Sequence, residues 1–264
     1  MFATVPTIVQ FMLCVVIGVA TGVLSAMFGV GGAVVSTPGI RVLGATPLEG
    51  IGSTLPSVLP SAISGALRYH REGFVRWPVV AKVAPWGCVA AIAGAIASVH
   101  FPGKGHVQML LTAALVLYTA IRTARRPRST HIDAEANTPM ATWWRSAIIG
   151  TLAGMLSGFL GVGGGILMTP TFRGWLKIPL KDTVATSLAC VGLIAIPSSI
   201  THIVEGTVNW VYALPLCIGV IPGARLGARF AIAASDRHLR LIIGWGLGTI
   251  GLGYGIAELI ALAH

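Results

Sequence analysis

Charged side chains are scarce in this 264-residue sequence, where Lys, Arg, Asp and Glu together make up only 10% of the residues. A soluble domain carries about 25% charged residues, so the composition excludes an ordinary soluble protein. A helix needs about 20 mainly apolar residues to cross a bilayer, and we therefore expect an all-α, polytopic membrane protein. Long uncharged runs occupy residues 1–40, 50–67, 83–103, 105–121, 146–172, 183–204, 206–224 and 241–257.

Acidic residues are the scarcest charges, and all eight lie in loops or near the ends of apolar runs. This placement argues against a carboxylate proton relay at mid-membrane and disfavours a divalent cation as substrate, because such cations take oxygen ligands. The cysteines give no sign of a metal or redox site, because the four thiols stand singly without C-x-x-C spacing. We predict no metal site and no cofactor. The cysteines, interpreted as buried thiols, are Cys14, Cys88, Cys190 and Cys217.

The net charge of +10 is explained better by loop charges that orient membrane helices than by nucleic-acid binding. If the N-terminus is outside and the segments alternate, 15 Lys and Arg residues fall in inside loops, whereas Arg41 and Lys104 fall outside and Lys82 lies near an inner helix end. The positive-inside rule then predicts a multi-pass protein of the plasma (inner) membrane with both termini extracytoplasmic.

The sequence contains an internal duplication with an offset of 132 residues. "TGVLSAMFGVGGAVVSTP" (21–38) matches "AGMLSGFLGVGGGILMTP" (153–170), and the shared frame E-G-x-V-x-W follows later in both halves, at 72–77 and 205–210. We therefore predict two membrane repeats, residues 1–121 and 146–264, joined by a polar cytoplasmic loop at 122–145.

Each repeat shows five apolar segments, or about eight to ten membrane segments overall. Because five is odd, the two repeats insert in opposite senses, an arrangement typical of secondary transporters whose site lies near the bilayer midplane. The segments are expected at 7–28, 30–43, 50–67, 77–99 and 105–121, and at 146–160, 163–172, 183–202, 208–232 and 241–260.

A glycine-rich stretch, "SGFLGVGGGILMTP" (157–170), interrupts an apolar run that is too short to cross the bilayer twice. The glycines therefore mark the tip of a re-entrant hairpin or a break between two short helices. Such a break leaves N–H groups and the positive end of a helix dipole exposed, which makes an anion site from backbone. Close helix packing through small residues is the alternative reading. The predicted site glycines are Gly29, Gly31, Gly32, Gly161, Gly163, Gly164 and Gly165.

Hydroxyl groups begin the apolar segment after each glycine stretch, where they could cap a helix or donate to an oxyanion. These are Ser53, Thr54, Thr186 and Ser187. Arg225 is the deepest basic residue and a further anion candidate, although a snorkelling anchor explains it as well. His70 and His202 lie near matching repeat positions and are candidates for a proton relay.

The repeated G-x-G-G segments followed by T-P, the Ala185-Thr186-Ser187 helix start and the "PGARLGARFA" segment (222–231) together resemble the TauE/SafE sulfite exporter family of anion permeases. The resemblance covers almost the whole chain. It implies transport of sulfite, thiosulfate, an organosulfonate or a related sulfur oxyanion, commonly outward from the cytoplasm. Repeat one departs from repeat two at Ala33, which stands opposite Gly165, and at Gly52-Ser53-Thr54.

We therefore expect a secondary carrier that works by alternating access and binds its anion at the glycine-rich helix ends. An anion channel, which could use the same helix ends, remains an alternative. A membrane-embedded enzyme is a weaker one, because the apolar segments contain no nucleophile–base pair and no set of metal ligands. The expected partners are the small anion and the lipid bilayer, without nucleic acid, and a homodimer is left open.

Overall fold

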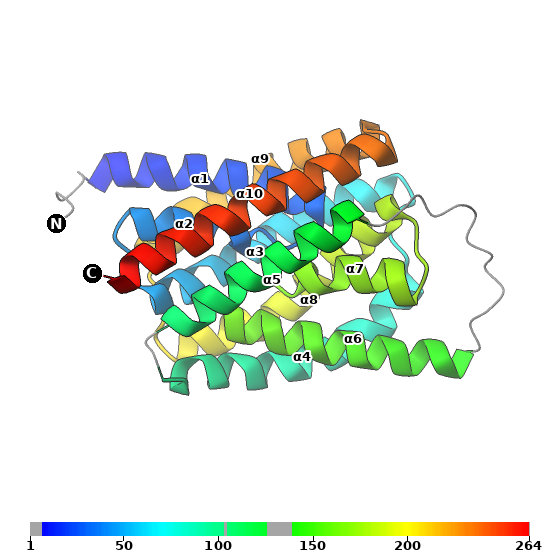
Figure 1. Cartoon of the computed structure of the whole chain (residues 1–264), viewed down its shortest axis with the longest axis horizontal. Helices are drawn as coiled ribbons and strands as arrows, with labels where there is room; N and C mark the ends of the chain where they lie inside the picture. The colour runs from blue at the N-terminus through cyan, green and yellow to red at the C-terminus, as the bar shows by residue number, and fades with distance from the viewer. Residues whose placement is uncertain (1–6, 103–104, 126–138, 264) are drawn as a thin grey trace.

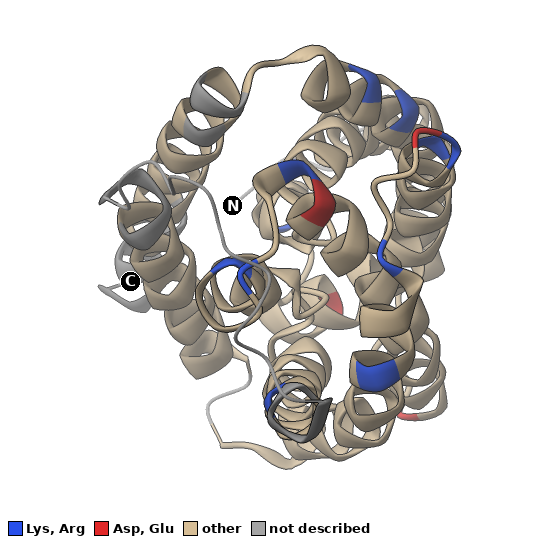
Figure 2. Cartoon of the chain, turned by 90° about the vertical axis from the view of Figure 1, so that its right-hand side faces the viewer, with Lys and Arg blue, Asp and Glu red and all other residues tan. Residues whose placement is uncertain are grey.

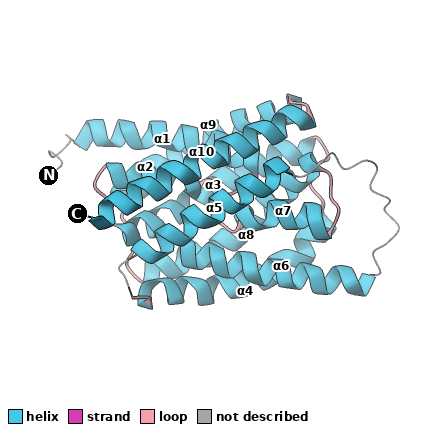
Figure 3. Cartoon of the chain, viewed as in Figure 1, coloured by secondary structure: helices cyan, strands magenta, loops and turns pink. Residues whose placement is uncertain are grey.

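The computed structural model describes residues 7–102, 105–125 and 139–263, and within these ranges it contains ten helices and no strand (Figures 1 and 3). The first half of the chain contributes α1 (Thr7–Phe28), α2 (Ala33–Val42), α3 (Pro47–Arg71), α4 (Trp77–His100) and α5 (His106–Arg125). The second contributes α6 (Pro139–Leu160), α7 (Gly165–Trp175), α8 (Leu180–Val204), α9 (Trp210–Ala233) and α10 (Asp236–Ala263).

Four helices of the described chain are long and apolar enough to cross a membrane, at Ile8–Phe28, Trp77–His100, Leu180–Val204 and Trp210–Ala233. Two shorter apolar stretches lie in α5 and α10, at His106–Ile121 and Leu241–Gly253. The helices thus follow the uncharged runs of the sequence, and the all-α membrane class is confirmed.

Helix occupies more of the connecting segment than its polarity suggests. α5 continues to Arg125, and α6 begins at Pro139 rather than at residue 146. Proline suits the first position of a helix, because its fixed φ is helical and its missing N–H would have no partner there. The remainder of the predicted loop, 126–138, lies outside the described residues.

Glycine-rich breaks separate two pairs of successive helices. Residues 29–32 lie between α1 and α2, and residues 161–164 lie between α6 and α7. After each break the chain doubles back. A Cβ atom added to Gly39 of α2 would lie 2.7 Å from Cγ2 of Ile17 on α1. Likewise, Nη1 of Arg145 on α6 donates to the carbonyl oxygen of Trp175 at the end of α7, over 3.2 Å.

The most extensive helix pairs join the two halves of the chain, since α1 packs along α9 and α6 packs along α4. Small residues bring the backbones together. A Cβ atom on Gly223 of α9 would collide with the carbonyl oxygen of Val19 on α1, and one on Gly154 of α6 would collide with that of Gly87 on α4. This is small-residue packing of the kind found between membrane helices.

The bundle has two ends of different charge. α1 begins and α10 ends at the left of Figure 1, whereas α6 begins at the right and runs opposite to α1. Figure 2 looks onto the right-hand end, where Lys and Arg gather. Two basic residues at this end make contacts to other parts of the bundle. Nε of Arg76 bonds Asp182 over 2.8 Å, and Nζ of Lys181 donates to Ile232 O over 2.6 Å.

Candidate functional site

The two glycine-rich breaks meet inside the bundle. A Cβ atom on Gly31 would lie 3.2 Å from Val162 O and 3.4 Å from the Cα of Gly163, and one on Gly165 would collide with Gly29 O. All of these residues are buried. We call this region, residues 29–32 together with 161–165, the glycine crossing. The structure therefore brings all seven predicted site glycines together.

Each break ends in a helix start that no side chain caps. Gly32 is the N-cap of α2 with φ 85°, and Gly164 is the N-cap of α7 with φ 71°. These left-handed conformations are readily accessible only to glycine. Neither N-cap has a side-chain hydrogen bond, and the first N–H groups of a helix have no partner within it. Two helix starts with positive dipole ends thus lie close together.

Two of the four predicted hydroxyl groups, those of Ser187 and Thr54, contact the breaks and the helices after them. The Ser187 hydroxyl donates to Gly29 O. Thr54 Oγ1 lies 3.3 Å from Thr37 Oγ1 on α2 and also donates to Gly50 O over 3.0 Å. Both hydroxyl groups are fully buried, so they connect α8 and α3 to the first break and its following helix.

Two further hydroxyl groups near the crossing have no hydrogen-bond partner among the described residues. They belong to Thr21 on α1 and Ser157 on α6, which are 1% and 0% exposed. A Cβ on Gly32 would lie 2.8 Å from Cγ2 of Thr21. A buried polar group without a partner is costly, so these two hydroxyls have hydrogen-bonding capacity left for a ligand. Sequence reasoning missed them as site residues, although Ser25 and Ser157 match within the repeat.

The crossing is closely packed in this structure. A cavity of about 10 Å³ adjoins the first break, where Ser25, Phe28, Val30 and Gly32 contribute to its lining. This volume has room for about one water molecule. A larger anion therefore needs the helices around the crossing to separate.

Ser53 and Thr186 are buried at matching repeat positions, and each accepts a hydrogen bond from a loop. Arg76 N donates to Thr186 Oγ1 over 3.1 Å, and Asn209 N donates to Ser53 Oγ over 2.8 Å. Both donors lie in the E-G-x-V-x-W frame of their repeat. The two hydroxyl groups thus fasten each such loop to the start of a helix from the other half.

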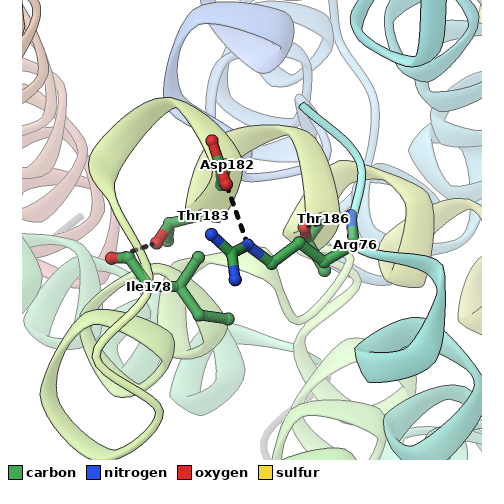
Figure 4. Close-up of polar contacts among 5 residues, drawn as sticks. All are labelled: Arg76, Ile178, Asp182, Thr183 and Thr186. Carbon is green, nitrogen blue, oxygen red and sulfur yellow. Dashed lines mark hydrogen bonds and ion pairs between the residues drawn. The ribbon is translucent and has the colours of Figure 1, made fainter. Parts of the chain in front are cut away.

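Figure 4 shows this contact at the start of α8, where the Arg76 side chain also bonds Asp182. Thr183 Oγ1 donates to Ile178 O over 3.1 Å beside it. The ion pair is partly solvated, with 49% of the Arg76 side chain and 19% of that of Asp182 exposed. These contacts hold the α3–α4 loop against the start of α8.

The two histidines lie in different surroundings. His202 is fully buried, with Nε2 3.0 Å from Gly158 O and Nδ1 2.9 Å from Thr207 Oγ1. His70 is exposed, and its Nδ1 accepts from Trp77 Nε1 over 3.1 Å. The residue that matches His202 in the E-G-x-V-x-W frame is Tyr69, a position that sequence reasoning passed over.

Arg225 and the crossing glycines do not line the same cavity. Arg225 is exposed on α9 and lines a surface cleft. None of the glycines of the crossing lines this cleft. Within the described ranges, no three His, Cys, Asp or Glu side chains come close enough to hold a metal ion.

Comparison with known proteins finds that this sequence is similar to membrane transporters. The family model described as "Sulfite exporter TauE/SafE" matches residues 14–254. The probable membrane transporter protein YunE of Bacillus subtilis is 27% identical over 239 residues, covering 83% of this chain and 88% of the relative. A probable membrane transporter protein of Methanocaldococcus jannaschii is 25% identical over 264 residues, covering 91% and 93%. No solved structure matches the chain significantly.

Proposed function

Because this chain belongs to the sulfite exporter TauE/SafE family, we propose that it is a secondary carrier for a small sulfur oxyanion such as sulfite, thiosulfate or an organosulfonate. Membership makes it a membrane transporter and not an enzyme. The substrate class and the alternating-access mechanism are the proposal.

One observation carries the assignment of an anion site to the glycine crossing. Two uncapped helix starts, at Gly32 and Gly164, begin from breaks whose glycines Gly31 and Gly163 approach one another closely. Backbone N–H groups and helix dipoles favour negative charge at such a point. The unpartnered hydroxyls of Thr21 and Ser157 would supply two more donors to an oxyanion with several oxygens.

We further propose that the two halves are inverted repeats with re-entrant hairpins α1–α2 and α6–α7. The opposite directions of α1 and α6 in Figure 1 support this relation. Two pairs of matching contacts support it as well. In the first, Tyr69 Oη donates to Ala26 O, and His202 Nε2 lies against Gly158 O. Ala26 and Gly158 are 132 positions apart, and Tyr69 and His202 are 133 positions apart. The loop contacts of Arg76 and Asn209 form the second pair.

Alternating access would then consist of movement of one repeat-derived set of helices against the other around the crossing. The close packing of the crossing fits a state in which the site is closed to both sides. We propose that the basic end of the bundle faces the cytoplasm of an inner-membrane protein, following the positive-inside rule. Both termini would then be extracytoplasmic.

The test is a panel of anions on the purified protein in detergent, comprising sulfite, thiosulfate, sulfoacetate, taurine and sulfate. A ligand that binds the folded state raises its apparent stability, so we expect at least one sulfur oxyanion to raise the unfolding temperature. If none does while a cation does, the proposal fails.

A second measurement separates the carrier from the channel that would use the same helix ends. Proteoliposomes loaded with the stabilising anion should show saturable counterflow of the labelled anion. Ohmic single-channel currents in a planar bilayer would instead overturn the carrier mechanism.

A further inference from the structure

Four arginines from two helices line one cleft at the basic end of the bundle. The cleft has a volume of about 570 Å³. Ser64, Leu67 and Leu226 complete the described lining, and Ser64 Oγ donates to Ile221 O over 3.0 Å, which holds α3 against α9 there. The arginines are Arg68 and Arg71 of α3 with Arg225 and Arg229 of α9, and we call this feature the arginine cleft.

The positive charge of the cleft is largely uncompensated. Among its described lining residues none is acidic, and the neighbouring Glu72 pairs with Arg68 alone, over 3.1 Å. Nε of Arg68 is buried and has no acceptor among the described residues. Arginine stays charged at every physiological pH and presents donors that match phosphate geometry. Three guanidinium groups thus face the cleft without a carboxylate partner in its lining.

The depth of the cleft corresponds to the level of lipid headgroups. α9 has 24 residues and is therefore about 36 Å long, slightly more than a hydrocarbon core of about 30 Å. Arg229 precedes the last residue of α9 by four positions, or about 6 Å. The guanidinium groups of Arg225 and Arg229 can therefore reach the interface along the helix.

An apolar groove begins where the arginine cleft ends. Leu67 lines both features. The groove has a volume of about 290 Å³ and runs between α3 and α8, with Ile63, Leu193 and Ile196 in its lining. These three side chains are 41–56% exposed, as expected for a surface that faces acyl chains. A free oxyanion would contact only the basic cleft, whereas a lipid would place its headgroup in the cleft and its acyl chain in the apolar groove.

We propose that the arginine cleft binds the phosphate group of an anionic lipid whose acyl chain lies beside Leu67 in the groove. Basic pockets between membrane helices on the cytoplasmic side are suited to such headgroups. The uncompensated guanidinium groups favour a lipid with two negative charges, such as cardiolipin or phosphatidic acid, over zwitterionic phosphatidylcholine. The shared chemistry is a phosphate group, so soluble phosphate is the competing source. The inference does not depend on which anion the crossing transports.

The experiment measures the unfolding temperature of the delipidated full-length protein in detergent while one of three probes is titrated. We expect cardiolipin to raise the unfolding temperature at micromolar concentration. Phosphatidylcholine and inorganic phosphate should have no effect there. Stabilisation by inorganic phosphate at the same concentration as cardiolipin would overturn the lipid assignment.

Matched variants locate the effect. Arg225→Gln and Arg229→Gln should each weaken cardiolipin binding, so that the half-saturating concentration rises about tenfold. Lys82→Gln removes the same charge from α4, outside the cleft lining, and should stay within twofold of the parent protein. An equal loss in Lys82→Gln would show that the effect is general charge attraction and would overturn the proposal. Because arginine at these positions is exposed, glutamine there leaves the fold intact.

Discussion

The hydroxyl group of Tyr69 at the end of α3 donates to the carbonyl oxygen of Ala26 near the end of α1, over 2.8 Å. Both residues are fully buried. Ala26 lies three residues before the first glycine-rich break, so this bond ties the approach to the glycine crossing to the last turns of α3. His202 and Gly158 make the matching contact before the second break.

Tyr69→Phe should lower the free energy of unfolding by about 1 kcal/mol, because the Ala26 carbonyl loses a buried donor. Thermal and denaturant unfolding in detergent measure the change. Tyr212→Phe is the comparison, since Tyr212 Oη reaches Leu43 O over 3.3 Å in a partly buried site. The change there should be smaller, and a larger one would contradict this reading of the two bonds.

Ser157→Ala should weaken binding of the stabilising sulfur oxyanion about tenfold while leaving stability unchanged or slightly higher. The Ser157 hydroxyl is buried without a partner, and removal of an unsatisfied group relieves a desolvation cost. Anion titration followed by the unfolding temperature gives both quantities. Ser98→Ala on α4 removes another buried, unpartnered hydroxyl and should leave anion affinity as it is. Unchanged affinity in Ser157→Ala would remove Ser157 from the site.

Gly164→Ala should abolish stabilisation by the anion. The new methyl group would collide with Ala153 O, and the residue would keep a φ of 71°. Gly206→Ala is the matched control, because Gly206 has φ 70° with nothing within 4 Å of the added Cβ. That control carries only backbone strain of about 1–3 kcal/mol. Anion binding retained in Gly164→Ala would return the crossing glycines to a packing role.

Thr186→Val should destabilise the protein more than Asp182→Asn. The first change leaves the Arg76 N–H without its acceptor, at a cost of about 1–3 kcal/mol. The second breaks an ion pair that is partly exposed, worth about 0–1 kcal/mol. Unfolding at low and high salt separates the two, because only the ion pair is screened. The reverse order would show that the ion pair holds the loop.

The start of α3 should contribute to acid sensitivity. Burial raises the pKa of Glu49, but hydrogen bonds from the backbone and side chain of Thr46 and from Asn209 outweigh it, so that this pKa is lowered below 4.5. A lowered pKa adds stability above the unfolded-state pKa, and this stability is lost as pH falls through the folded value. The unfolding temperature should therefore drop below about pH 4.5, and Glu49→Gln should flatten that part of the profile. An identical profile would exclude Glu49 as a source.

The sequence predicts the positions of the helices and of the two breaks better than it predicts which residues of the breaks touch. Helix α4 (Trp77–His100) matches the segment expected at 77–99, whereas α8 (Leu180–Val204) begins three residues before the segment expected at 183–202 and includes Lys181 and Asp182. The glycines of both breaks follow from the duplication. The expected inverted repeat predicts that the two breaks lie near one another. The close approach of Gly31 to Gly163 depends on tertiary packing between residues 132 positions apart, and nothing local to either break indicates it.

Some missed features did leave a signal. Gly219, Gly223 and Gly227 face α1, so Arg225 and Arg229 fall on the opposite, exposed side of the same helix. The spacing of these glycines thus carried a signal, unused in the sequence analysis, that Arg225 lies at the surface. The alignment of the E-G-x-V-x-W frames likewise points to Tyr69 rather than His70 as the partner position of His202. The unpartnered state of Ser157 could not be read, since it depends on every neighbour.

The pairing of α1 with α9 and of α4 with α6 bears on synthesis. When α1 leaves the ribosome, the helix that later packs along it, α9, is still about 180 residues away in the chain. The entropic cost of closing so long a loop rises only slowly with its length, so the separation delays the contact more than it weakens it. Lipid must cover the inner face of α1 until the second half is made. The α1–α9 and α4–α6 pairs can therefore form only once the second half of the chain has been made.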